Sequence, residues 1–412
     1  GMEVFGSSGA RGIAGTELTP EFVLQVAQAA GTVWEADRAP VATDTRLTGQ
    51  MFADATASGL AGVGLDVDRL GLTPTPAIGR YCEQEAIPGV MLTASHNPPE
   101  YNGIKLIGAD GIELSIDRLE RIEAHALGEE FDLVPWELVG ESREVDTANA
   151  TYQQSLLDAI DTERIVDADL TVALDPGHGA GGVVSPEFYR ELGCEVVTVN
   201  AQLDGRFPGR MPEPVPENLD DLGRLVEAAD ADVGIAHDGD ADRSVFFDEQ
   251  GRFIDGDASL AALAARELSA GDHTVAAVNV SQRLVDVCER VVAELALTPM
   301  RASPLIPRIQ ELGTAWWALQ VAGEIERAVL VEDETRRNRA PSVRHCGEHN
   351  RPLALSAHPH RLDFVRAHVR AHEAVDNRLG FFGRYFRPSV RRLWCRHGFC
   401  GGTVEGVVAP RP

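Results

Sequence analysis

The composition of this 412-residue chain excludes several classes of protein. The apolar fraction of 44% is ample for packed cores. The sequence has no run of about 18 or more apolar residues, so no membrane span is predicted. The net charge of −27 argues against a nucleic-acid partner, because phosphate backbones require a basic surface. No basic and apolar signal sequence opens the chain, so we expect a soluble, cytoplasmic protein.

Lysine is nearly absent, since Lys105 is the single lysine among 37 basic residues. An acidic, lysine-poor surface is typical of a salt-rich cytoplasm, where counter-ions screen self-repulsion, although plain acidic solubility also explains it. The six cysteines are scattered, which favours free thiols in a reducing compartment. The composition leaves the oligomeric state open.

Strand-like and helix-like segments alternate up to about residue 315. Thr19 and Pro20 predict the start of a helix that runs to about residue 30, with the threonine as cap. Further helices are predicted at 50–61, 75–86 and near 147–160, and strands within 39–46, 63–71, 88–95, 168–182, 193–201, 231–243 and 272–280. Such alternation favours α/β layers with mainly parallel sheets, in which ligands lie at the carboxyl ends of strands.

The composition changes in the last part of the chain. Residues 321–412 hold 16 arginines and 10 acidic residues, a net charge of +6, together with 7 of the 12 histidines. Two interpretations stay open. This tail is either a very different terminal module or a segment translated in a shifted reading frame.

The segment VMLTASHNPPEYNGIKL, residues 90–106, ends a predicted strand at Ser95. His96 and Asn97 place polar groups beside that hydroxyl, and two prolines stiffen the loop that follows. An ordinary turn would explain this much equally well. Lys105 favours a functional loop, because a lysine can hold a phosphate and also release a proton, which arginine cannot readily do.

A second polar loop, AHDGDADRS at residues 236–244, follows another predicted strand. Asp238, Asp240 and Asp242 would repel one another unless a cation neutralises them, and hard oxygen ligands suit Mg²⁺. A calcium hand is excluded because its sixth position should be glycine and is Arg243, whereas a solvated acidic turn remains an alternative. Arg243 would supply positive charge to an anionic substrate. A serine beside a carboxylate-bound Mg²⁺ indicates phosphoryl transfer with the serine as covalent carrier.

Two glycine-rich segments remain. FGSSGARG, residues 5–12, puts Arg11 in a flexible loop that could bind an anion. DPGHGAGG, residues 175–182, lacks the glycine spacing of a dinucleotide site and the lysine of a P-loop. We interpret it as a tight connection between a strand and a helix.

Taken together, TASHNP with NGIK, DGDADR, FGSSGARG and the bridge DGRFPGRMPEPVPENL resemble the α-phosphohexomutase superfamily, which includes phosphomannomutase/phosphoglucomutase and phosphoglucosamine mutase. The resemblance is collinear from Phe5 to about Gly256. It implies an α/β fold of three related mixed α/β domains around a cleft, followed here by an atypical or degraded C-terminal segment. The implied divisions are domain I with the phosphoserine loop (1–140), domain II with the metal loop (150–250), a partly divergent sugar-binding domain III (251–335) and the atypical tail in place of domain IV (336–412).

The resemblance also implies a mechanism and a set of site residues. Ser95 would be carried as phosphoserine and would donate its phosphoryl group to a hexose phosphate. The resulting hexose 1,6-bisphosphate would turn over and return its other phosphate to the serine. The implied ligands of Mg²⁺ are Ser95, Asp238, Asp240 and Asp242; the implied catalytic residues are Ser95, His96, Lys105 (a candidate general acid/base), Arg11 and Arg243; and the implied substrate-binding residues are Asn97, Gly323 and Glu324.

The chain departs from the family pattern after domain II. The sugar-reading loop, Gly-Glu-x-Ser/Asn-Gly in the family, reads VAGEIERAVL here, and the Arg-x-Ser-Gly-Thr-Glu-Pro phosphate loop is absent from the sequence. One alternative function is therefore a catalytically impaired sugar-phosphate-binding protein of the same fold. Another is an aspartyl-phosphate phosphatase, although such enzymes place Thr or Val after Asp-x-Asp. The identity of the sugar, whether mannose, glucose or glucosamine, stays open.

Overall fold

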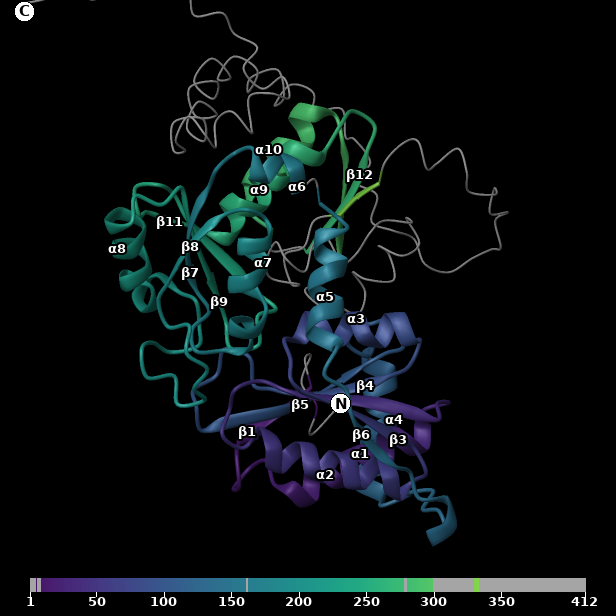
Figure 1. Cartoon of the computed structure of the whole chain (residues 1–412). Helices are drawn as coiled ribbons and strands as arrows, with labels where there is room; N and C mark the ends of the chain where they lie inside the picture. The colour runs from purple at the N-terminus through teal and green to yellow at the C-terminus, as the bar shows by residue number, and fades with distance from the viewer. Residues whose placement is uncertain (1–4, 6–8, 161, 278–279, 299–329, 333–412) are drawn as a thin grey trace, which may run out of the picture. The chain divides into compact units, whose positions relative to one another are not determined.

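Helices and strands alternate along the part of the chain that the computed structural model describes, namely residues 5, 9–160, 162–277, 280–298 and 330–332 (Figure 1). The strands form three sheets, which confirms the expected α/β fold class. The atypical tail, Gly323 and Glu324 lie outside the described residues. No helix among the described residues combines the length and apolar character needed to cross a membrane.

The first sheet has six strands in the order β1-β5-β4-β2-β3-β6. Their bounds are Ala10–Ile13 (β1), Arg38–Thr43 (β2), Asp66–Leu72 (β3), Gly89–Leu92 (β4), Tyr101–Ile107 (β5) and Ser142–Glu144 (β6). The strands β4, β2, β3 and β6 run parallel, as predicted, whereas β5 is antiparallel to both of its neighbours. The parallel arrangement brings the ends of β2 and β4 to the same edge.

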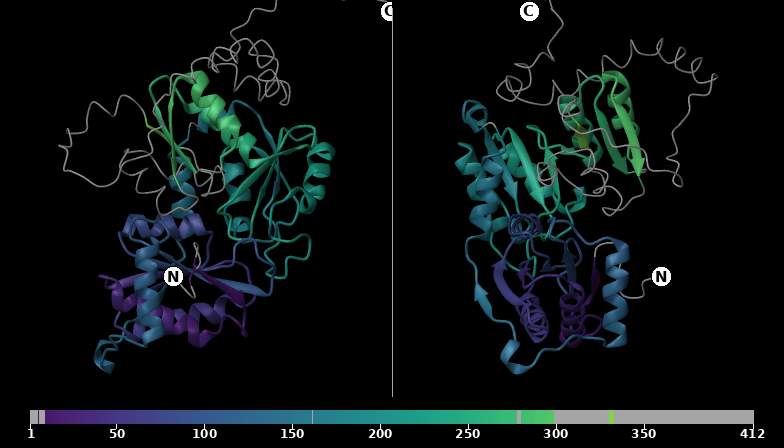
Figure 2. Two further views of the ribbon diagram at one scale, coloured as in Figure 1. Left: turned by 180° about the vertical axis from the view of Figure 1, so that it is seen from behind. Right: turned by 90° about the vertical axis from the view of Figure 1, so that its right-hand side faces the viewer.

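The helices of this sheet cover both faces. Their bounds are Pro20–Val33 (α1), Gly49–Gly62 (α2), Thr75–Glu85 (α3) and Ile116–Gly128 (α4). Figures 1 and 2 show α1 and α2 side by side on the face opposite α3. Thr19 caps α1 by accepting a hydrogen bond from the backbone of Phe22, which confirms the predicted helix start, although the helix runs to Val33.

Side chains alternate between the two faces along each strand, and this decides where Lys105 points. Val90 and Leu92 of β4 pack in the core beneath α1, α2 and α4, whereas Met91 packs with α3. Met91 is paired with Lys105 of β5 in the antiparallel register, so both residues lie on the α3 face. The lysine therefore leaves the sheet on the side where α3 begins.

The second sheet has the order β11-β10-β9-β7-β8. The elements of this part are Ala148–Leu157 (α5), Thr162–Val166 (α6), Thr171–Asp175 (β7), Ser185–Glu191 (α7), Glu195–Thr198 (β8), Asp220–Ala228 (α8), Val233–His237 (β9), Ser244–Phe247 (β10) and Phe253–Ile254 (β11). The central strand β7 is parallel to β8 and β9, and β10 is antiparallel to β9. Apolar residues of α5 and α7 pack in one core and those of α8 in another.

The prediction of a buried strand within residues 193–201 was wrong in one respect. The strand β8 forms, but its two end residues are exposed and its two middle residues are only half-buried. It is an edge strand of the sheet and pairs on one side only among the described residues. Edge strands shield fewer of their side chains than central ones do.

The third sheet is small, with the order β13-β12-β14. Its elements are Gly256–Glu267 (α9), His273–Ala277 (β12), Gln282–Val291 (α10), Glu294–Thr298 (β13) and Leu330–Glu332 (β14). Asp255 caps α9 by accepting a hydrogen bond from the backbone of Ala258. The proposed domain boundaries stay predictions.

Candidate active site and metal centre

Ser95 lies in a turn just after β4. The predicted strand ends at Leu92 rather than at Ser95, although the Thr93 backbone N–H still donates to the Gly103 carbonyl of β5 at 3.0 Å. The Thr93 hydroxyl donates to Asp44 Oδ2 at 2.7 Å and accepts from the backbone N–H of Ser95 at 2.9 Å. Ser95 itself has φ of +51°, a left-handed conformation that is rare outside glycine and tends to occur at functional sites.

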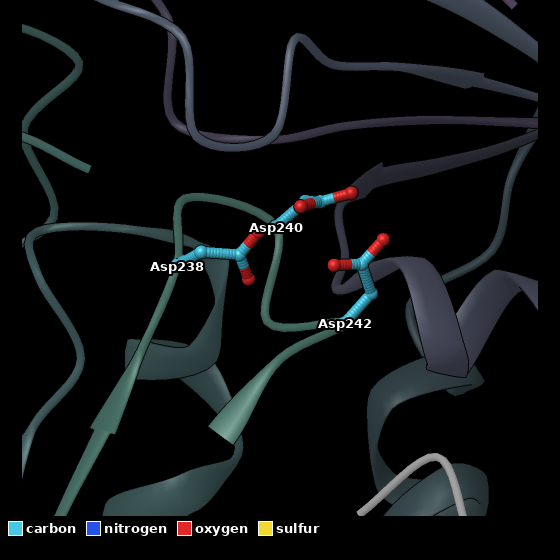
Figure 3. Close-up of side chains that lie close together, drawn as sticks. All are labelled: Asp238, Asp240 and Asp242. Carbon is cyan, nitrogen blue, oxygen red and sulfur yellow. The ribbon is translucent and has the colours of Figure 1, made fainter. Parts of the chain in front are cut away.

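The three aspartates follow β9 and form one cluster. Asp238, Asp240 and Asp242 each offer a carboxylate oxygen, and these atoms lie within 4.8 Å of one another (Figure 3). One oxygen each of Asp240 and Asp242 is buried and has no hydrogen-bond donor among the residues that the structure describes. Buried acceptors are normally satisfied, so the cluster fits a cation bound by oxygen ligands.

Ser95 and the aspartate cluster meet directly. Ser95 Oγ donates a hydrogen bond to Asp238 Oδ2 at 2.7 Å, and both residues are almost fully buried. Burial, followed by the charges of Asp242 and Asp240, raises the pKa of Asp238 well above its ordinary value. The hydroxyl therefore lies beside the carboxylates that would hold a cation.

The close approach of the two loops depends on Gly239. A Cβ atom at this position would lie 2.5 Å from the backbone oxygen of Ser95. Any side chain would therefore push the serine loop, which we define as residues 93–101, away from the aspartates.

His96 lies beside the serine. Its Nδ1 atom is 3.4 Å from Ser95 Oγ. Burial, followed by the positive charges of Arg243 and Arg11, lowers the pKa of His96 from 6.5 to about 4. The imidazole is therefore neutral near pH 7.

Lys105 is 2% exposed and lies among three carboxylates. Its Nζ atom is 3.2 Å from Asp240 Oδ2, 3.0 Å from Asp242 Oδ2 and 3.3 Å from Glu113 Oε1. Burial alone would lower the pKa of Lys105, but these carboxylates outweigh it and raise the pKa well above its ordinary value. The single lysine of the chain thus carries a buried positive charge at the candidate site.

Asp240 is also held by the first turn of α3. The Thr75 hydroxyl donates to Asp240 Oδ2 at 2.6 Å, and the Thr75 backbone N–H donates to the Asp240 carbonyl at 3.0 Å. Burial raises the pKa of Asp240, but Lys105 and the Thr75 hydroxyl outweigh burial and hold that pKa below its ordinary value. The helix terminus and the lysine therefore fix this carboxylate from two directions.

Arg11 does not lie in a flexible loop, so that prediction was wrong. It belongs to β1 and is paired with Gly103 of β5. A Cβ atom on Gly103 would lie 3.0 Å from Arg11 Cγ, so the glycine lets the edge strand approach closely. Arg11 Nη1 donates to Asn97 Oδ1 at 3.1 Å, which joins both residues to the serine loop.

Arg243 completes the group of predicted residues. Its backbone N–H donates to Asp238 Oδ1 at 3.2 Å, and its Nε atom is 3.9 Å from Asp242 Oδ1. The structure thus brings together all the predicted site residues that lie among its described residues.

The sequence interpretation missed several residues of this region. Thr75 and Glu113 contact the charged groups directly, and Asp44 and Arg46 hold the serine loop. Thr75 carried a usable signal, because it lies in the first turn of a predicted helix, next to prolines. Glu113 carried none, since nothing in its local sequence indicates a lysine partner.

Comparisons with known proteins identify the family of this chain. Residues 2–132 match the family model described as "Phosphoglucomutase/phosphomannomutase, alpha/beta/alpha domain I", and residues 150–251 match the model of domain II. The chain is 42% identical over 304 residues to the "Phosphoglucomutase/phosphomannomutase" of Thermococcus kodakarensis, covering 72% of this chain and 66% of that protein. It is 43% identical over 293 residues to the "Probable phosphoglucosamine mutase" of Methanopyrus kandleri, covering 71% of this chain and 63% of that protein.

A solved structure supports the same assignment. The structure of a phosphoglucomutase/phosphomannomutase family protein from Burkholderia thailandensis has a TM-score of 0.66 and 27% sequence identity, over 79% of this chain and 71% of that one. The chain spans just under two thirds of the length of the two curated relatives. The family models, the relatives and the motifs agree, and the chain therefore belongs to the phosphoglucomutase/phosphomannomutase family of the α-D-phosphohexomutase superfamily.

Proposed function

We propose that this chain is a phosphohexose mutase, an intramolecular phosphotransferase that interconverts hexose 6-phosphate and hexose 1-phosphate. Ser95 carries the phosphoryl group, and a hexose 1,6-bisphosphate is the intermediate. The observation that carries the proposal is the hydrogen bond of 2.7 Å between Ser95 Oγ and Asp238 within the aspartate cluster. The names of the relatives support the same reaction.

The proposed transfer forms one bond, breaks one bond and moves one proton. Attack by Ser95 Oγ on a phosphate of the bisphosphate forms an O–P bond and breaks the bond between phosphorus and the sugar oxygen. The serine loses a proton and the sugar oxygen gains one. Lys105 remains the candidate general acid/base, and its buried charge would also face the anionic phosphate.

The cluster of Asp238, Asp240 and Asp242 is proposed to hold Mg²⁺ together with Ser95. The proposed ligands are all oxygen atoms, and two of the buried carboxylate oxygens have no hydrogen-bond donor within the described part of the chain. A bound Mg²⁺ would neutralise negative charge on the oxygens of the transferring phosphoryl group.

The remaining residues are proposed to bind the substrate. Arg11 and Arg243 would supply positive charge on either side of the serine loop, and neutral His96 and Asn97 would supply hydrogen bonds. Gly323 and Glu324 stay proposed as residues that bind the sugar. The names of the relatives divide between phosphoglucomutase/phosphomannomutase and phosphoglucosamine mutase, so assays should cover all three sugars.

A second candidate function is binding of sugar phosphates without turnover. One observation favours it, namely that Ile325, Glu326 and Arg327 stand where the family pattern has a variable residue, Ser or Asn, and Gly. Retained metal binding with no conversion of any hexose phosphate would support this alternative.

The test is phosphorylation of the purified chain. Wild type, Ser95→Ala and Ser142→Ala are incubated with glucose 1,6-bisphosphate and Mg²⁺, and intact mass and peptide mapping locate the label. Ser142 lies on the exposed edge strand β6 and is the matched control. We expect one phosphoryl group on wild type and on Ser142→Ala but none on Ser95→Ala. A label on an aspartate would favour a phosphatase, and an unlabelled wild type would refute the proposal.

A further inference from the structure

Arg46 is a buried arginine in the loop after β2, and all five of its N–H donors are used. Its Nε atom donates to Asp44 Oδ2 at 3.0 Å. The other four hydrogen bonds go to backbone carbonyl oxygens of the serine loop, namely those of Ser95 (2.9 Å), Asn97 (2.7 Å), Pro98 (2.6 Å) and Tyr101 (2.8 Å). One guanidinium group therefore holds the whole loop that carries the reactive serine.

The backbone of Ser95 is fixed from both sides. Its N–H is bound by the Thr93 hydroxyl, which donates in turn to Asp44, while its carbonyl is bound by Arg46. A residue with φ of +51° is unfavourable and persists only where its surroundings over-determine it. Asp44, Arg46 and Thr93 provide that surrounding, because the parallel strands β2 and β4 end at the same edge.

The segment 204–210, DGRFPGR, contacts Arg46 from the second part of the chain. The Arg46 Cζ atom lies 5.3 Å from the centre of the Phe207 ring, within range of a cation–π interaction. A Cβ atom on Gly205 would lie 2.6 Å from Arg46 Cα, so the glycine permits close packing of the two backbones. The sequence alone had predicted no role for segment 204–210.

The same segment is anchored where the aspartate loop begins. Arg210 donates to Asp175 Oδ2 at 2.9 Å, at the end of β7, and also to the carbonyl of His237, which precedes Asp238. A continuous set of contacts therefore runs from the serine loop through Arg46 and Phe207 to Arg210 and the aspartate loop.

We propose that Arg46 is the positioning residue of Ser95, and that the segment 204–210 keeps Arg46 and the aspartate loop in register. The inference rests on the proposed function and adds to it a residue outside the implied catalytic set. Arg46 acts through the serine loop, since its donors are all engaged by protein oxygens. A displacement of about 1 Å at a reacting group can cost about 100-fold in rate, so the loss of Arg46 should slow phosphoryl transfer strongly.

The experiment measures the rate at which glucose 1,6-bisphosphate phosphorylates Ser95, by rapid quenching and intact mass. The variants are Arg46→Lys and Phe207→Leu, and the control is Arg69→Lys, which alters only a partly exposed ion pair with Asp54. Lysine offers three donors at one point and cannot replace a planar fork of five. We expect about 100-fold slower labelling for Arg46→Lys, about ten-fold slower labelling for Phe207→Leu and the wild-type rate for Arg69→Lys.

Two readouts separate positioning from general loss of structure. A variant that is partly unfolded labels a smaller fraction of molecules, whereas a mispositioned serine labels slowly but to completion. The concentration of bisphosphate at half-maximal rate should also stay near that of wild type, because Arg46 does not face the substrate.

The outcomes distinguish this inference from the proposed function. If wild type takes up no phosphate, the proposed function fails. If wild type is labelled and both variants are labelled at its rate, the positioning role is refuted. If Arg46→Lys does not fold, Phe207→Leu decides alone, and an unchanged rate in that variant overturns the inference.

Discussion

The hydroxyl of Ser95 donates a hydrogen bond of 2.7 Å to Asp238, a residue 143 positions later in the chain. The serine comes from the turn after β4 and the aspartate from the end of β9, so two different sheets supply the two groups. Neither loop contains the candidate site by itself. Substitutions in either sheet should therefore affect the same chemistry.

Removal of one carboxylate should weaken binding of a divalent cation. In Asp238→Asn, one of the three carboxylates becomes a neutral amide, and we expect the dissociation constant for Mg²⁺ or Mn²⁺ to rise at least about ten-fold. Titration calorimetry at constant ionic strength measures this. Asp221→Asn is the control, because Asp221 is exposed and forms a surface ion pair with neighbouring Arg224 of the same helix. Equal affinities in wild type and Asp238→Asn would contradict a metal centre here.

Lys105 should resist amine-selective reagents in the folded protein. It is 2% exposed, and its three carboxylate neighbours raise its pKa, so little free amine is present. We expect an activated ester to modify the N-terminal amine of the native chain and to modify Lys105 only after unfolding in urea. Because Lys105 is the single lysine, intact mass alone reports the result. Rapid modification of the native lysine would show that it is accessible.

Gly239→Ala should slow phosphorylation of Ser95 without removing any charged group. The new methyl group would lie 2.5 Å from the Ser95 carbonyl oxygen and would force the serine and aspartate loops apart. We expect a decrease of about 100-fold in the labelling rate. Gly62→Ala is the matched control, since the nearest atom to its Cβ would be 3.9 Å away. A wild-type rate in Gly239→Ala would mean that the loops need not meet during transfer.

Val292→Gly should stabilise the third part of the chain. Val292 is the C-cap that follows α10 and has the left-handed conformation, with φ of 62°, and it is 71% exposed. A β-branched residue is strained there, and glycine should gain about 1 kcal/mol in the free energy of unfolding. Urea denaturation measures the change. Val291→Gly, one residue earlier within the helix, should destabilise instead, and a gain in both variants would argue against relief of strain.

The sequence predicted the polar loops better than it predicted their partners. Ser95 and the aspartates could be found because polar residues that follow apolar strands gather at the carboxyl ends of a parallel sheet. Lys105 could be found because it is the single lysine of the chain. In both cases the signal is local or compositional.

The contacts that hold these groups could not be predicted in the same way. Thr75 binds Asp240 across 165 residues, and Arg46 binds carbonyl oxygens that carry no sequence signal. Arg11 was placed in a loop because its segment is rich in glycine, yet pairing with β5 makes Ala10–Ile13 a strand. Tertiary pairing can therefore override the local preference of a glycine-rich segment.

The order of the two loops along the chain has a consequence for biosynthesis. The ribosome releases the serine loop and Arg46, which belong to the same domain, before the aspartate loop and segment 204–210 are made. Since domains fold as units from the N-terminus, a nascent chain would display Ser95, the proposed nucleophile, before the three aspartates are made. The proposed phosphoryl transfer would then begin only once the second sheet has emerged and packed against the first.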